Sequence, residues 1–100
     1  MSDNIYIIGG IQSALNPIFK KHRVKKATLF GSYAKGQATA KSDIDLLLDS
    51  GLRGLKFVGL VEDIHTALDK DVDVFDVTHI IPDSTIYNEI NRDGVTIYEA

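Results

Sequence analysis

The chain has 100 residues, of which 44% are hydrophobic, so it can form one compact domain but not two. It contains no cysteine, which excludes disulfides and thiolate metal sites. The formal net charge of -3 argues against broad non-specific binding of nucleic acid, which needs a basic surface. We therefore expect residues 1–100 to be a single domain that relies on a partner to present any large substrate.

The first residues of the chain and its hydropathy indicate a cytoplasmic protein. Met1-Ser2-Asp3-Asn4 carries none of the basic residues that open a secretory signal. No apolar run approaches the ~20 residues that a membrane-spanning helix needs.

The first predicted element is a helix from about Asn4 to His22, with apolar residues at helical spacing. Pro17 cannot donate to the helical ladder, so we expect a kink there or a restart capped by Asn16. A basic cluster follows, made of Lys20, Lys21, His22, Arg23, Lys25 and Lys26. A solvated helix end is the favoured interpretation of this cluster, and a docking patch for RNA or an acidic partner is the alternative.

Two short strands come next. Ala27 to Phe30 predicts a strand that ends at Gly31, and Asp43 to Leu48 predicts a second strand. Because side chains alternate along a strand, Ile44, Leu46 and Leu48 should share one face, and Asp43, Asp45 and Leu47 the other.

The second half of the chain continues the alternation of helices and strands. Lys56 to Asp69 predicts an amphipathic helix, and Val72 to Val77 a third strand. Pro82-Asp83-Ser84 should begin a last helix that reaches about Arg92, where Gly94 ends it before an edge strand at Val95 to Tyr98. This order predicts an α/β domain.

The pair Gly31-Ser32 is a candidate anion site. Gly31 ends a strand, Ser32 is expected to open a helix, and the free N–H groups of a helix start attract anions. Glycine lets a phosphate approach the backbone, and the Ser32 hydroxyl adds a donor. Alone, the pair is equally well explained as a turn in which Ser32 is an N-cap.

Three aspartates form a candidate metal site. Asp43 and Asp45 are two apart on a strand, so their like charges repel unless a cation lies between them. Mg²⁺ prefers such oxygen ligands and keeps positions open for substrate phosphates. Asp73 lies among valines and a phenylalanine in a predicted strand, where aspartate is uncommon, and would complete a two-metal site. Asp71 and Asp76 are the rivals for that third position.

Taken together, these motifs resemble the signature of the DNA polymerase β-like nucleotidyltransferases. Gly31-Ser32, ten intervening residues and Asp43-x-Asp45 are similar to that superfamily, and closest to its minimal nucleotidyltransferases of prokaryotes. The resemblance covers nearly the whole chain, about Asn4 to Tyr98. Its further matches are Leu29-Phe30, Ala34-Lys35-Gly36, Ala38, Ser42 and Val72-Asp73-Val74. The resemblance implies the nucleotidyltransferase fold, a small mixed β-sheet flanked by helices.

The resemblance also implies an activity, the transfer of AMP from ATP with Mg²⁺. Gly31 and Ser32 would hold the β- and γ-phosphates, helped by Lys35 and Ser42. Asp43 and Asp45 would bind both metal ions, while Asp73 would bind the catalytic ion and help to deprotonate the acceptor.

Relatives of this kind are commonly paired with a small helical HEPN-domain toxin. The resemblance therefore implies an antitoxin that adenylates a hydroxyl of that partner. Lys35 stands where the family often has arginine, and it keeps the charge but loses the bidentate fork. A module that neutralises its partner by binding alone, and a transferase acting on RNA, remain the alternatives.

Other interpretations fit the residues less well. Phosphatases of the haloacid-dehalogenase type also use an Asp-x-Asp pair, but there the apolar strand precedes the pair, and here Leu46-Leu47-Leu48 follows it. Glycosyltransferases with such a pair are much longer. The histidines, His22, His65 and His79, have no metal-site spacing, and only His79 follows the strand of Asp73. The sequence does not indicate which base the protein prefers.

Overall fold

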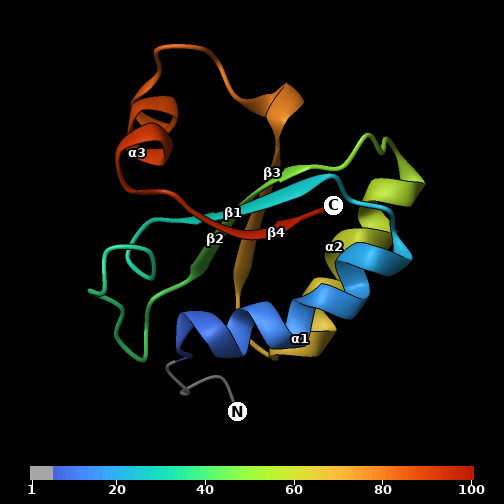
Figure 1. Cartoon of the computed structure of the whole chain (residues 1–100), viewed down its shortest axis with the longest axis horizontal. Helices are drawn as coiled ribbons and strands as arrows, with labels where there is room; N and C mark the ends of the chain where they lie inside the picture. Colours follow the sequence, from blue (N-terminus) through green and yellow to red (C-terminus); the bar gives the residue numbers. More distant parts are fainter. Residues whose placement is uncertain (1–5) are drawn as a thin grey trace.

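Four short strands form one mixed sheet at the centre of the protein (Figure 1). The computed structural model describes residues 6–100. The strands lie in the order β3-β2-β1-β4, and β2 is antiparallel to β1 and parallel to β3, while β4 is antiparallel to β1. Their bounds are Lys26–Phe30 for β1, Ile44–Asp49 for β2, Val72–Asp76 for β3 and Val95–Glu99 for β4. The predicted edge strand is thus confirmed as β4.

Two helices cover one face of this sheet. Figure 1 shows α1 (Ile8–Lys21) and α2 (Leu55–Leu68) on one side and α3 (Thr85–Asp93) on the other. Each of the first two helices buries one apolar stripe against the sheet, as their periodicity predicts. The fully buried residues are Ile11, Leu15 and Phe19 of α1, Leu60, Ile64 and Leu68 of α2, and Ile44, Leu46 and Leu48 of β2. The predicted parity of β2 is therefore confirmed.

The first helix differs from its prediction at Pro17. The predicted start at Asn4 lies outside the described residues, and α1 runs unbroken from Ile8 to Lys21 with Pro17 inside it. The expected restart capped by Asn16 is therefore wrong. Pro17 removes one helical hydrogen bond, but Leu15 and Phe19 are fully buried on either side of it. That burial outweighs the lost bond and holds both halves against the core.

The end of α1 explains part of the basic cluster. Lys21 and His22 both meet Asp63 of α2, at 3.2 and 2.7 Å. Hydrogen bonds from His22 and then Lys21 hold the pKa of Asp63 below its ordinary value. For these two residues the structure agrees with the helix-end interpretation.

Among residues 6–100 no helix has the length and apolar character that crossing a membrane requires.

The opposite face of the sheet is only partly covered. Asp45, Leu47 and Asp49 of β2 alternate with the buried residues and are half-exposed. The short helix η1 (Val77–His79), which the sequence did not predict, follows β3, and α3 begins after Ser84, whose hydroxyl accepts a hydrogen bond from the Tyr87 N–H. This cap confirms the predicted start of the last helix. Within residues 85–93, all of which are described, no side chain is fully buried.

Asp76 is a buried carboxylate that ties the ends of β2 and β3 together. One carboxylate oxygen accepts the N–H and hydroxyl of Ser50, at 3.1 and 2.7 Å, and the other accepts the N–H and hydroxyl of Thr78, at 3.2 and 2.9 Å. Burial alone would raise the pKa of Asp76, but these bonds together lower it below its ordinary value.

We expect Asp76→Asn to lower the free energy of unfolding by about 2–3 kcal/mol at pH 7, because the amide turns a donor toward N–H and O–H donors. A carboxylate with a lowered folded pKa stabilises the fold above its unfolded pKa of about 3.9, and this contribution is lost as pH falls through the folded pKa. The difference between wild type and variant should therefore shrink in acid. Urea unfolding at several pH values measures it, with the exposed Asp83→Asn as the control that stays near wild type. An equal loss at all pH values would contradict this account.

Candidate active site

The site is built by the register of β2 between its two neighbours. Phe30, the last residue of β1, pairs with Asp45, so the chain leaves β1 at Gly31 directly beside that carboxylate. On the other side Asp45 pairs with Asp73 in the parallel register. Paired residues on adjacent strands point to the same face and lie about 4.8 Å apart. The sheet therefore brings together three of the predicted positions, although they are far apart in sequence.

Gly31 is required at its position by two separate constraints. Its φ of 76° lies in the left-handed region, which side chains other than glycine rarely adopt. A Cβ on Gly31 would also collide with a carboxylate oxygen of Asp45. In the structure the group that lies close to this glycine is the Asp45 carboxylate, and the approach of a phosphate to Gly31 stays a prediction.

The segment after Gly31 is a compact turn, and the predicted helix at Ser32 is wrong. The Lys35 N–H donates to the Gly31 carbonyl at 3.2 Å, and the Gln37 N–H to the Ser32 carbonyl at 2.9 Å. Gly36, at a φ of 71°, ends the turn before a regular helix can form. The N–H groups at its start can still face an anion, but without the dipole of a long helix.

Asp45 is the most perturbed group of the site. Burial raises its pKa to about 6, helped by the charge and a side-chain hydrogen bond of Asp73 and, more weakly, by the charges of Asp43 and Glu89. Two carboxylates that share a hydrogen bond also share a proton, which is the arrangement expected where like charges meet without a cation. A divalent cation could take the place of that proton.

The donor set fits a hard metal ion, although it is not preassembled. Asp43 lies just before β2 and is exposed, while Asp45 and Asp73 face each other across the strands. Across residues 6–100 no three acidic, histidine or cysteine side chains are close enough together to hold an ion as they stand. Because these three aspartates offer only carboxylate oxygens, the ion that suits them is Mg²⁺ rather than a soft metal.

Glu89 is a residue of the site that sequence reasoning missed. Its carboxylate lies 3.1 Å from the Lys35 ammonium, and so it ties α3 to the turn that follows Gly31. The charge of Glu89 also acts on Asp45. No spacing signal links Glu89 to Lys35, because the last helix must first fold over the sheet.

The connection between the turn and β2 is held by its own contacts. The Ser42 hydroxyl accepts a hydrogen bond from the Thr39 N–H at 2.9 Å, so in this structure it closes a local turn. The Lys70 ammonium, largely buried, donates to the Ala40 carbonyl at 3.0 Å. Because Lys70 precedes β3, this contact holds the loop before Asp43 against the start of β3, the strand that contains Asp73.

Neither rival of Asp73 is paired with Asp45 in the register of β2 and β3. Asp71 precedes β3 and is exposed, and its carbonyl accepts the Ile44 N–H at 3.1 Å. Asp76 has the opposite parity and is used by Ser50 and Thr78. The Nδ1 atom of His79 accepts the Asp76 N–H, and its ring packs edge-on against Phe57, which is a structural role.

The sequence is similar to known nucleotidyltransferases. A family model described as polymerase beta, nucleotidyltransferase matches residues 13–100. A protein of Methanocaldococcus jannaschii named as a protein adenylyltransferase, MJ0435, is 39% identical over 77 residues, which are 75% of this chain and 83% of the relative.

Solved structures agree with the fold. A crystal structure of a toxin–antitoxin with AMP-PNP matches with a TM-score of 0.70 at 23% identity, over 89% of this chain and 73% of that one. A structure of tri-AMPylated Shewanella oneidensis HEPN toxin in complex with MNT antitoxin matches with a TM-score of 0.66 at 20% identity, over 94% and 74%. These likenesses concern the fold, and they confirm the mixed sheet flanked by helices that the resemblance implied.

We expect Gly31→Ala to weaken the binding of ATP with Mg²⁺ at least about tenfold, because the new Cβ displaces the Asp45 carboxylate. Gly51→Ala is the matched control, since Gly51 has a similar φ of 70° but nothing lies within 4 Å of its Cβ position. Both variants should lose about 1–2 kcal/mol of stability from left-handed strain, measured by urea unfolding. Calorimetric titration with ATP should show weaker binding for Gly31→Ala than for Gly51→Ala. Equal ATP affinities of the two variants would contradict the close approach of the Asp45 carboxylate to Gly31.

Proposed function

The chain belongs to the polymerase beta nucleotidyltransferase family, and on that premise we propose that it transfers AMP from ATP to a hydroxyl group of a partner protein. One observation carries this proposal. Asp45 is held between Gly31 and Asp73 by the register of three adjacent strands, on the half-open face of the sheet. A nucleotidyltransferase needs this combination of a phosphate-accepting turn and adjoining carboxylates.

Each residue of the proposed site has a distinct role. The N–H groups after Gly31 and the Ser32 hydroxyl bind the β- and γ-phosphates, and Lys35 neutralises part of their charge when it exchanges Glu89 for a phosphate oxygen. Asp43 and Asp45 hold Mg²⁺. When bound, Mg²⁺ neutralises charge that develops on the phosphates.

Asp73 would act on the acceptor. The acceptor oxygen forms a bond to the α-phosphorus while the bond from that phosphorus to the bridging oxygen of the β-phosphate breaks. Pyrophosphate leaves, and the Asp73 carboxylate takes the hydroxyl proton. Because β3 is one of the two edge strands of the sheet, a protein acceptor can approach Asp73 from that edge.

For the acceptor we propose a HEPN-domain toxin, which would make this chain the antitoxin of a pair. Support comes from the Shewanella oneidensis complex, whose toxin is tri-AMPylated, and from the relative named as a protein adenylyltransferase. Nucleotide binding has the support of the matching structure that contains AMP-PNP.

We expect a HEPN-domain toxin that forms a complex with this chain to gain one or more AMP units when the two are incubated with ATP and Mg²⁺. Asp45→Asn or Asp73→Asn should abolish the gain, and removal of Mg²⁺ with a chelator should do the same. Asp71→Asn is the matched control, because Asp71 belongs to the same acidic segment but lies before β3, outside the register that pairs Asp73 with Asp45. Intact mass spectrometry measures the gain. Full modification by Asp45→Asn would refute the proposal.

A binding module without catalysis is the second candidate. Two observations favour it: Lys35 is paired with Glu89, and the three carboxylates are not gathered around one point within the described part of the chain. The double variant Asp43→Asn, Asp45→Asn discriminates between the two functions. If the variant forms the complex but no longer neutralises the partner, the function is catalytic; if it still neutralises the partner, binding is sufficient.

A further inference from the structure

The outer edge of β3 has one position that is open to an added strand. β3 pairs only with β2, so alternate residues of β3 turn their N–H and C=O groups away from the sheet. The outward carbonyl of Val72 accepts a hydrogen bond from His65 at 2.9 Å, and the outward N–H of Asp76 donates to Nδ1 of His79 at 3.1 Å. Val74 lies between them, and within residues 6–100 its outward N–H and C=O form no hydrogen bond. Val74 therefore offers one donor and one acceptor at this edge.

A small apolar pocket adjoins the open position. Its volume is about 160 Å³, and its lining comes from the end of β3, the loop that follows and the start of α3: Phe75, His79, Ile80, Ile81, Ser84 and Ile86. This volume is below the roughly 300–1,000 Å³ of sites that enclose a small molecule, so it suits a single side chain. Ile81 and Ile86 are 72% and 36% exposed. Exposed apolar side chains that gather around a hollow are typical of a surface that binds another protein.

The pocket lies next to Asp73 on the same strand. Asp73 and Phe75 flank Val74, and they are successive residues on the open face of β3, about 7 Å apart along the strand. The ring of Phe75 meets Phe30 across β2, with 6.0 Å between the ring centroids, which holds this wall of the pocket in place. A residue that pairs with Val74 from outside the sheet would place its two neighbours beside Asp73 and beside Phe75.

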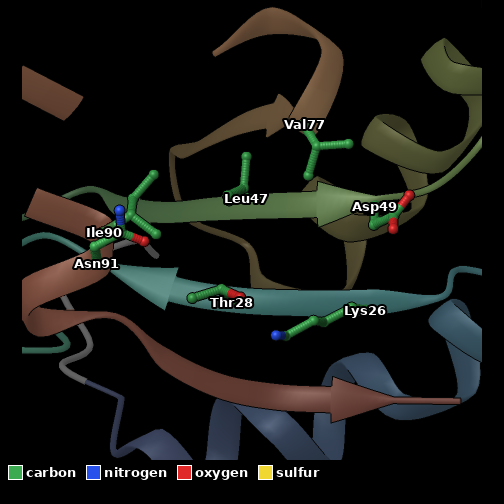
Figure 2. A pocket seen from close by; sticks show the side chains of 7 residues that line it. All are labelled: Lys26, Thr28, Leu47, Asp49, Val77, Ile90 and Asn91. Atoms are coloured by element: carbon green, nitrogen blue, oxygen red, sulfur yellow. The ribbon is translucent and has the colours of Figure 1, made fainter. Parts of the chain in front are cut away.

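A groove beneath α3 is separate from this pocket and lies over β1 and β2. Figure 2 shows it between Thr28, Leu47 and Ile90, with Val77 on the side of β2 away from β1. Val77 lines that groove, while the residues two to four positions later line the pocket beside β3. The pocket therefore belongs to the β3 edge, whereas the phosphate-binding turn follows β1 on the other side of β2.

Charge at the β3 edge narrows the choice of what can bind there. Asp71, Asp73 and Asp83 are exposed, and no basic side chain of residues 6–100 forms an ion pair with them. Pairing of β3 with the β3 of a second copy would bring these acidic edges together, so like charges oppose that occupant. A segment of another protein that carries Lys or Arg is attracted instead.

We propose that the acceptor segment of the partner protein binds in extended form along the outer edge of β3, with its hydroxyl beside Asp73 and an apolar side chain, two residues away, in the pocket at Phe75. The residue between these two pairs with the free N–H and C=O of Val74. Main-chain pairing of this kind supplies affinity, and the pocket for an alternate side chain supplies specificity. The proposal rests on the proposed function, because it needs Asp73 to act on the acceptor.

The test measures the rate of AMP transfer to a HEPN-domain toxin that forms a complex with this chain. We expect the double variant Ile81→Ser, Ile86→Ser to raise KM for the toxin about tenfold with kcat unchanged, because the pocket binds a part of the acceptor that does not react. Binding of ATP with Mg²⁺, measured by calorimetric titration, should stay at the wild-type value. Leu55→Ser is the matched control, since Leu55 is an apolar residue that is 88% exposed and lies outside the pocket. Urea unfolding checks that all variants are folded.

A second measurement examines the acceptor itself. Tandem mass spectrometry of the modified toxin locates the hydroxyl, and we expect an apolar residue two positions from it. Exchange of that residue for serine in the toxin should raise KM about tenfold, and the pocket variant should add no further increase, because both changes remove the same contact. Exchange of the residue two positions away on the other side is the control.

Each outcome decides the proposal. An unchanged KM in the pocket variant, or an acceptor without an apolar residue two positions away, would overturn it and leave the proposed function standing. Weaker ATP binding by the pocket variant would assign the pocket to the nucleotide and would also overturn it. If the wild-type chain transfers no AMP to the toxin, this proposal and the proposed function fail together.

Discussion

The register of β2 is the constraint on which the rest of the structure depends. Antiparallel pairing with β1 sets Phe30 beside Asp45, and parallel pairing with β3 sets Asp73 on its other side. A slip of one residue would turn Asp45 toward the core and Leu46 toward solvent. The register is held by the burial of Ile44, Leu46 and Leu48 beneath α1 and α2. The hydrophobic core therefore specifies the position of the carboxylates, although it contains none of them.

The same arrangement places unfavourable charge in the middle of the sheet. Burial and the neighbouring Asp73 raise the pKa of Asp45 to about 6, and Asp43 and Glu89 add their charges. Lys35 offsets part of this through Glu89. A side chain that destabilises the isolated fold is a common feature of sites that bind cations. Asp76 is the contrast within the same acidic segment, because Ser50 and Thr78 satisfy its charge.

Much of the fold could be predicted because local rules agree with the tertiary structure. The alternation in β2, the Ser84 cap and the strand that follows Gly94 all depend on residues within a few positions of one another. The helix restart expected at Asn16 was wrong because long-range burial outweighed a local rule, and the helix at Ser32 was wrong because Gly36 ends the turn early.

The candidate site could be predicted only where its residues carry a spacing. Gly31, Asp43 and Asp45 belong to one motif, and the structure does bring Gly31 and Asp45 into contact. Glu89 and the groove below α3 depend on how a distant helix lies across the sheet, and no pattern in the chain encodes that placement.

The weak attachment of α3 has a consequence for how the protein opens. Since no side chain of residues 85–93 is fully buried, this helix separates from the sheet at a lower free energy than α1 or α2, whose stripes form the core. Amide hydrogens of α3 should therefore exchange with solvent ahead of those in β1 and β2. The sheet with α1 and α2 therefore keeps the aspartates in place, while α3 opens by local unfolding. A substrate can enter beneath α3 without the core being disturbed.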